Sequence, residues 1–205
     1  MNLLAKAMPL LLATAASALA MDGAYVGAQL GHNHFADRAN IKGLKKETLE
    51  HNLGYALFSG YGKKIDDFYL GAELAIGNGY PSKRHTARVG AAPNNRTGYR
   101  YEKGVTLGAS LKAGYFVLPG YLLYGKVAIE RSKDKAIVYI ANIMPMNVTK
   151  TVFNIVPGIG VEKIMENHSV KLEYSRDLSK NIKYDDKHSF GYTNHQVKVG
   201  FSVKV

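Results

Sequence analysis

Acidic and basic residues recur on the polar side of several segments in which apolar residues occupy every second position. Successive side chains of a β-strand point to opposite faces, so this spacing gathers the charges on one face. Four acids and four bases on one enclosed face would pair, because an unpaired buried ion costs several kcal/mol. The sequence therefore predicts mutual neutralisation or, if partners exchange, a narrow ion pathway. The residues concerned are Glu73, Lys112, Lys126, Glu130, Glu162, Lys171, Glu173 and Lys198.

A catalytic or metal-binding arrangement is not evident in the sequence. A serine hydrolase needs a serine, a histidine and a carboxylate that converge, and Asp185, His188 and Ser189 all fall in one polar stretch with nothing to orient them. The chain has no cysteine, and its histidines lack the spacing of a metal site. We therefore expect no enzyme, no metal and no cofactor. The histidines considered are His32, His34, His51, His85 and His195.

The alternating segments predict the strands that must position these charges. The clearest is 194–205, where Val197, Val199 and Phe201 alternate with polar residues or glycine. Eight segments are found, an even number, as a closed antiparallel barrel of a bacterial outer membrane requires. We predict an all-β fold, a transmembrane up-and-down barrel of eight strands. The other seven segments are 25–31, 53–61, 68–76, 105–115, 121–130, 153–162 and 169–174.

Two features do not fit this pattern simply. The apolar run 136–140 lies in a predicted loop and is either a strand extension above the membrane or part of an extra hairpin, which would give ten strands. Pro157 lies inside a predicted strand and has no N–H for the ladder, so we expect a β-bulge there.

Short and long connections alternate between the predicted strands. The short ones are 63–67, 118–120 and 164–167, and the long polar ones are 32–50, 78–103, 131–150 and 176–190. Outer-membrane barrels have short periplasmic turns and long extracellular loops. Four aromatic residues flank two of the short turns on the apolar face, as an interfacial girdle would: Tyr61, Phe68, Tyr115 and Tyr121.

The first 20 residues predict a cleavable signal peptide. Lys6 precedes an apolar, alanine-rich run, and Ala18-Leu19-Ala20 forms a small-x-small cleavage site. The run is shorter than the roughly 20 apolar residues of a membrane-spanning helix. We therefore expect residues 21–205 to form one barrel domain, exported to the bacterial outer membrane.

Several short stretches resemble the eight-stranded transmembrane domain of OmpA-type proteins and related small outer-membrane barrels. They are AYVGAQLG at 24–31, GAEL at 71–74, LKAGY at 111–115, GIGVE at 158–162 and VKLEY at 170–174. The resemblance implies an interior ion-pair cluster formed by Glu73, Lys112, Glu162 and Lys171. It also implies the outer-membrane assembly machinery as a partner. The sequence departs from the family at Gln29, where a lumen lysine is common, and at Val205, where many such barrels end on an aromatic residue.

The formal net charge of +11 is concentrated in the predicted long loops. The second loop has six basic residues against Glu102 alone, namely Lys83, Arg84, Arg88, Arg96, Arg100 and Lys103. At a cell surface the polyanions available are lipopolysaccharide phosphates and host glycans, and nucleic acid is not an expected partner. The alternative is an ordinary solvated loop. We expect a non-enzymatic surface barrel, a structural and adhesin-like component in contact with outer-membrane lipid. A small porin-like diffusion channel and, third, a lipid A-modifying enzyme stay open.

Overall fold

The computed structural model describes residues 23–41, 44–78, 85–88, 96–139, 146–185 and 188–205. The predicted signal peptide lies outside these ranges and stays a prediction. In the part of the chain described, no helix is long and apolar enough to cross a membrane.

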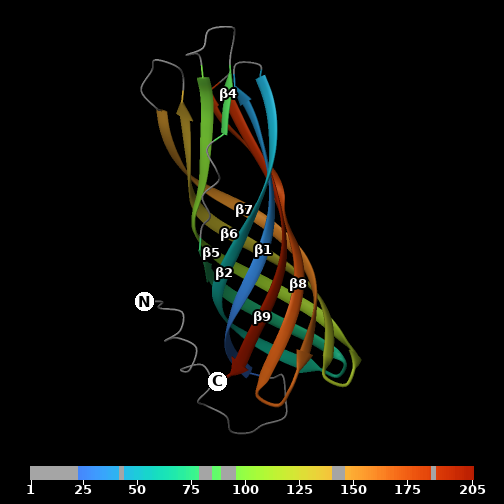
Figure 1. Cartoon of the computed structure of the whole chain (residues 1–205). Coiled ribbons are helices and arrows are strands. Elements are labelled where there is room, and N and C mark those ends of the chain that lie inside the picture. Colours follow the sequence, from blue (N-terminus) through green and yellow to red (C-terminus); the bar gives the residue numbers. More distant parts are fainter. Residues whose placement is uncertain (1–22, 42–43, 79–84, 89–95, 140–145, 186–187) are drawn as a thin grey trace, which may run out of the picture.

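Eight long antiparallel strands form a closed ring. Each strand pairs with the next along the chain, and the pairs β1–β9 and β3–β5 complete the closure (Figure 1). A ninth, short strand, β4 (His85–Arg88), pairs only with β5, beyond the end of β3. The predicted eight-stranded up-and-down barrel is confirmed. The eight strands are β1 (Gly23–Ile41), β2 (Leu44–Ile65), β3 (Phe68–Gly77), β5 (Arg96–Leu118), β6 (Tyr121–Tyr139), β7 (Met146–Ile164), β8 (His168–Asp185) and β9 (His188–Lys204).

Three tight turns lie at one end of the barrel, where the sequence predicts them. They join β2 to β3, β5 to β6, and β7 to β8. Two of them contain a residue with positive φ, Asp66 at 54° and Gly120 at 74°. Asp66 is an acceptable residue for this conformation, since aspartate tolerates the left-handed region better than most non-glycine residues. Around these turns the four girdle aromatics are exposed on the outer wall, and the rings of Phe68 and Tyr115 meet edge to face at 5.3 Å.

The opposite end differs from the prediction, because much of the expected loop sequence is strand. β1 and β2 stay paired from Gly23↔Gly62 to Ile41↔Leu44, across most of the stretch predicted as the first long loop. β6 likewise continues to Tyr139, so the run 136–139 extends a strand and forms no extra hairpin. Polar side chains do not end a ladder whose hydrogen bonds come from the backbone.

The wall separates into two sheets toward this upper end. The β7–β8 ladder runs only from Gly158↔Ser175 to Ile164↔Ser169, and the β2–β3 ladder ends at Ala56↔Gly77. Beyond those pairs, β2, β1, β9 and β8 form one sheet, and β7, β6, β5 and β4 form the other (Figure 1).

The expected bulge at Pro157 was wrong. The β6–β7 register is unbroken through Val127↔Pro157. Ile164 donates its N–H to the carbonyl of Gly120 on the β6 side, so the alternation along β7 turns the nitrogen of Pro157 toward β8. The β7–β8 ladder begins only at Gly158, and the missing N–H therefore costs no ladder hydrogen bond.

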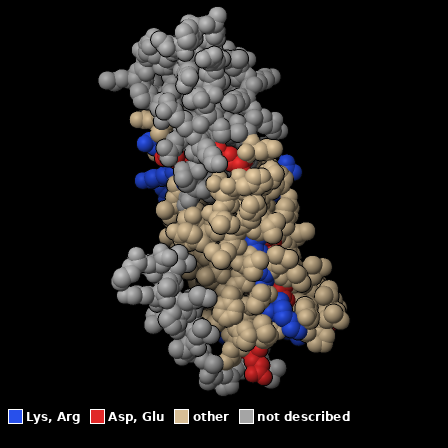
Figure 2. Space-filling model, viewed as in Figure 1, with Lys and Arg blue, Asp and Glu red and all other residues tan. Residues whose placement is uncertain are grey.

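The wall presents apolar side chains outward and polar ones inward. Leu30, Leu53 and Leu111 are 67%, 79% and 72% exposed, whereas glutamates and lysines at the alternate positions are buried. Figure 2 shows that most of the middle of the wall on the visible face is uncharged, with charged side chains toward its upper and lower ends. An apolar outer band with a polar interior is the arrangement that a barrel needs in a lipid bilayer.

Candidate functional site: the ion-paired lumen

Aromatic and aliphatic side chains fill the lower end of the lumen. Tyr69, Leu122 and Tyr124 are almost completely buried against one another, and Phe116 and Ile164 pack beside them. Glycines on the inner face make room for these rings. A Cβ atom on Gly62 would overlap the hydroxyl group of Tyr69, so the close approach requires glycine at that position.

Glu73, on β3, is the acceptor at the centre of the lumen. Its carboxylate accepts hydrogen bonds from Lys171 Nζ at 3.2 Å and from Lys112 Nζ at 3.4 Å, and Lys126 Nζ lies 3.8 Å away. Lys112 also donates to Glu162 at 2.9 Å. β3, β5, β6, β7 and β8 each contribute one of these charges, so the ion pairs cross the barrel interior.

A second carboxylate, Glu173, extends the network. It pairs with Lys126 and, at 3.6 Å, with Lys198 on β9. Three acids and four lysines thereby form one connected group, here called the central cluster: Glu73, Glu162, Glu173, Lys112, Lys126, Lys171 and Lys198. With the exception of Lys198, at 12% exposed, every member has a side chain at least nine-tenths buried.

Aromatic groups complete the shell around the central cluster. Tyr25 donates a hydrogen bond to Glu73 at 3.0 Å, and Tyr124 donates one to Glu173 at 3.2 Å. Lys112 Nζ lies 5.0 Å from the ring centroids of both Tyr69 and Tyr124. Lys171 Nζ lies 3.7 Å above the Phe58 ring. Cation–π contacts of this kind partly replace the water that buried ammonium groups have lost.

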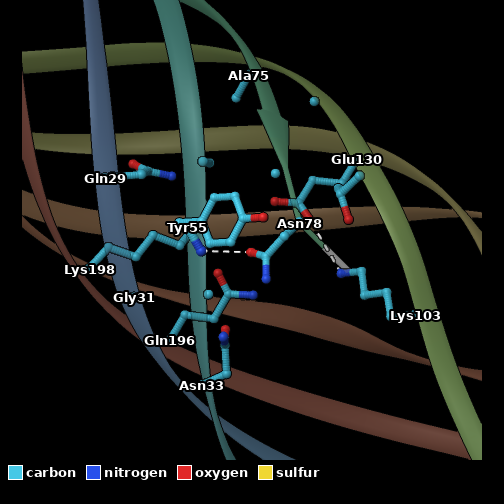
Figure 3. Close-up of a pocket in the computed structure, with 15 residues that line it drawn as sticks. Gln29, Gly31, Asn33, Tyr55, Ala75, Asn78, Lys103, Glu130, Gln196 and Lys198 are labelled. Atoms are coloured by element: carbon cyan, nitrogen blue, oxygen red, sulfur yellow. Dashed lines mark hydrogen bonds and ion pairs between the residues drawn. The ribbon is translucent and has the colours of Figure 1, made fainter. Parts of the chain in front are cut away.

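A smaller group of ions, here called the upper cluster, lies nearer the extracellular end. Lys103 Nζ lies 3.4 Å from both Glu130 and Asp177, and Gln196 donates to Asp177 at 3.5 Å. A cavity lies between the two clusters, and Figure 3 shows Lys103 and Glu130 on one side of it and Lys198 on the other. Another cavity lies at the periplasmic end. The central cluster separates the two; the lower one is lined by residues including Tyr25, Tyr69, Glu162, Ser169 and Ser202.

The structure places all eight predicted lumen residues on the inner face. Sequence reasoning missed four further charged residues that are buried on the inner face, Glu50, Lys103, Asp134 and Asp177. Asp177 continues the alternation of Lys171 and Glu173 along β8, so extending that strand by a few residues would have found it.

The assignment of Lys103 to the basic second loop was wrong. Its side chain is 4% exposed and faces the lumen. The β5–β6 register shifts between Lys103 and Thr106, and this irregularity turns odd-numbered positions of β5 inward above it. Simple alternation from Lys112 would have placed Lys103 outside.

The remaining predicted sites fall outside the described side chains. These are the polyanion-binding candidates Lys83, Arg84, Arg88, Arg96 and Arg100, and the hydrolase candidates Asp185, His188 and Ser189. Among the residues that the structure does describe, no group of three or more histidines or acids is arranged to hold a metal ion.

A closed barrel with an apolar outer band and an ion-paired interior defines a bacterial outer-membrane barrel protein. The chain belongs to the outer membrane protein β-barrel domain family, whose model matches residues 4–204. The family places it in the bacterial outer membrane, and no curated protein sequence matches it.

Solved outer-membrane barrels are similar to this chain at low sequence identity. The outer membrane protease OmpT from Escherichia coli is 10% identical over 93% of this chain and 99% of its own, with a TM-score of 0.51. Neisserial surface protein A is 15% identical over 90% and 98%, with a TM-score of 0.46. Ail, the attachment invasion locus protein of Yersinia pestis, is 14% identical over 88% and 99%, with a TM-score of 0.42. At these identities the likeness concerns the fold alone.

Proposed function

We propose that this protein is a non-enzymatic, non-conducting structural barrel, exported by a cleaved signal peptide, whose basic extracellular loops contact polyanions as an adhesin does. One observation supports the closed lumen most strongly. Seven ion-paired side chains cross the interior of an eight-stranded barrel and contact the rings of Tyr25, Tyr69, Tyr124 and Phe58. The interior of such a barrel is only about wide enough for side chains to fill it.

The polyanion proposal rests on the charge of the second loop. Five basic residues, four of them arginines, lie between positions 83 and 100 with no acid among them. Arginine binds phosphate or sulfate through paired hydrogen bonds. The candidate partners are the lipopolysaccharide of the same membrane and sulfated or sialylated host glycans.

Replacing Lys83, Arg84, Arg88 and Arg96 with glutamine tests this proposal. Each cation near an anionic surface contributes about 1 kcal/mol, so the variant should lose most of its salt-sensitive binding to heparin or lipopolysaccharide. Lys63→Gln is the control, because that lysine is exposed at the opposite end of the barrel, beside the β2–β3 turn. If the quadruple variant bound polyanions as tightly as the parent at low salt, the second loop would be an ordinary solvated loop with no polyanion-binding role.

A small diffusion channel is the second candidate, and the contacts of Glu73 favour it. Three lysines surround one carboxylate at 3.2 to 3.8 Å, so exchange between partners could carry an ion past the cluster. Cavities lined in part by charged and polar side chains lie on both sides of the cluster. Conductance across a planar bilayer distinguishes the two candidates, and mass changes in lipid A on expression would reveal an enzyme.

A further inference from the structure

Three histidines from three neighbouring strands lie side by side on the outer wall. His34 on β1 is the register partner of His51 on β2 and of His195 on β9. Arg176 on β8 is in turn the partner of His195. These four residues, here called the basic row, therefore lie across four adjacent strands, although the sequence separates them widely.

Contacts between side chains show that the row is one cluster. The His34 and His51 ring centroids are 4.6 Å apart, and those of His34 and His195 are 6.5 Å apart. His32, one alternation below His34, forms a hydrogen bond of 3.1 Å with His51. Tyr174 forms one of 2.6 Å with Nδ1 of His195.

The row lies at the outer edge of the apolar band. Ala24 is the partner of Tyr61, a member of the periplasmic aromatic girdle. From Ala24 to His34, a rise of about 3.3 Å per residue at a tilt of about 40° gives roughly 25 Å of height, the height of the apolar band of such barrels. Directly below the row, Leu30, Leu53 and Val197 are exposed on the outer wall. The row is thus at the level of the outer-leaflet headgroups.

The charges around the row are of one sign. Among the side chains described on β2, β1, β9 and β8, none on the outward face is acidic, and the nearby Glu50 and Asp177 are buried. Among the side chains that the structure describes on these strands, the titratable and charged groups facing the row are His32, Tyr174 and the row itself. Of these, only Arg176 is charged at every pH of interest, and the imidazoles add charge as the pH falls through the range where histidine protonates.

We propose that the basic row binds the phosphate groups of lipopolysaccharide in the outer leaflet, and binds them more tightly as the pH falls. The height estimated above puts the row at the level expected for the lipid A phosphates. This proposal rests on the outer-membrane location and not on the polyanion-binding loops.

Binding of diphosphoryl lipid A to the folded, detergent-solubilised protein tests it, at pH 5.5 and at pH 8. Each cation near an anionic headgroup contributes about 1 kcal/mol, so added positive charge on the row should tighten binding by about tenfold at the lower pH. A triple glutamine variant of His34, His51 and His195 should lose the tightening at low pH, leaving the weakening that follows when the phosphate itself gains a proton at about pH 6. The single variant His195→Gln should reduce the tightening even if the triple variant fails to fold. The matched control is His168→Gln, an outward histidine at the periplasmic rim, which should keep it.

Two further binding measurements complete the test, one with a lipid that lacks phosphate and one with the quadruple loop variant. Dephosphorylated lipid A should show no pH dependence, since the headgroup then offers no anion. The quadruple loop variant should keep the pH-dependent part, which separates failure of this proposal from failure of the loop proposal. An unchanged pH dependence in the triple histidine variant, or an equal one with dephosphorylated lipid A, would overturn the assignment.

Discussion

Replacing Glu73 with glutamine should destabilise the barrel strongly. Glutamine keeps the size of the side chain and can still accept the hydrogen bond from Tyr25, but it removes the negative charge that Lys112, Lys126 and Lys171 share. Removing one partner of a buried ion pair costs about 3–5 kcal/mol, because the other charge remains buried without compensation. We therefore expect Glu73→Gln to lower the free energy of unfolding by about 3–5 kcal/mol.

The assay is urea unfolding in phospholipid vesicles, with the folded fraction measured by the mobility of unheated samples on a gel. Glu166→Gln, at the exposed β7–β8 turn, is the matched control and should change the unfolding free energy by less than about 0.5 kcal/mol. The double variant Glu73→Gln with Lys171→Met should lose less than the two single variants together, because it removes both charges of one pair. A loss below about 1 kcal/mol for Glu73→Gln, or strictly additive losses, would mean that water solvates the lumen charges and would refute the reasoning.

Two further predictions concern single residues of the lumen, and a third concerns the closed barrel as a whole. Gly62→Ala should cost about 1–3 kcal/mol of stability by displacing Tyr69, whereas Gly125→Ala, where a Cβ would meet nothing within 4 Å, should not destabilise the barrel in the same urea titration. Lys103→Met should lower stability by leaving Asp177 buried without its ammonium partner, and should leave retention on a heparin column unchanged; the reverse pattern would mark Lys103 as a loop residue. The unheated protein should migrate differently from the boiled protein and fractionate with the outer membrane, because a closed ladder resists detergent until heated; recovery from the soluble periplasm would contradict the fold.

The wall of the barrel could be predicted from the sequence because its signal is local. Each strand alternates between lipid and lumen, so a period of two identifies both the strand and the face of each residue. This is how Glu73, Glu162 and Lys171 could be assigned to the lumen before any pairing was known.

The features that could not be predicted from the sequence depend on pairing between distant segments. Whether Lys103 points into or out of the barrel depends on a register shift between β5 and β6, and the alternation of residue types does not reveal that shift. The tolerance of Pro157 depends on where the β7–β8 ladder begins. The basic row could not be predicted either, because His34, His51 and His195 become neighbours only through the registers of β1 with β2 and β9.

The conductance of the purified protein in a planar bilayer tests the central claim, that ion pairs close the lumen, most directly. Because the central cluster crosses the barrel interior and contacts its tyrosines, the unmodified protein should show no large steady conductance. Lys112→Ala removes the ammonium group between Glu73 and Glu162, and should either raise the conductance or destabilise the fold. A large, steady conductance in the unmodified protein would contradict the closed lumen and favour the diffusion channel.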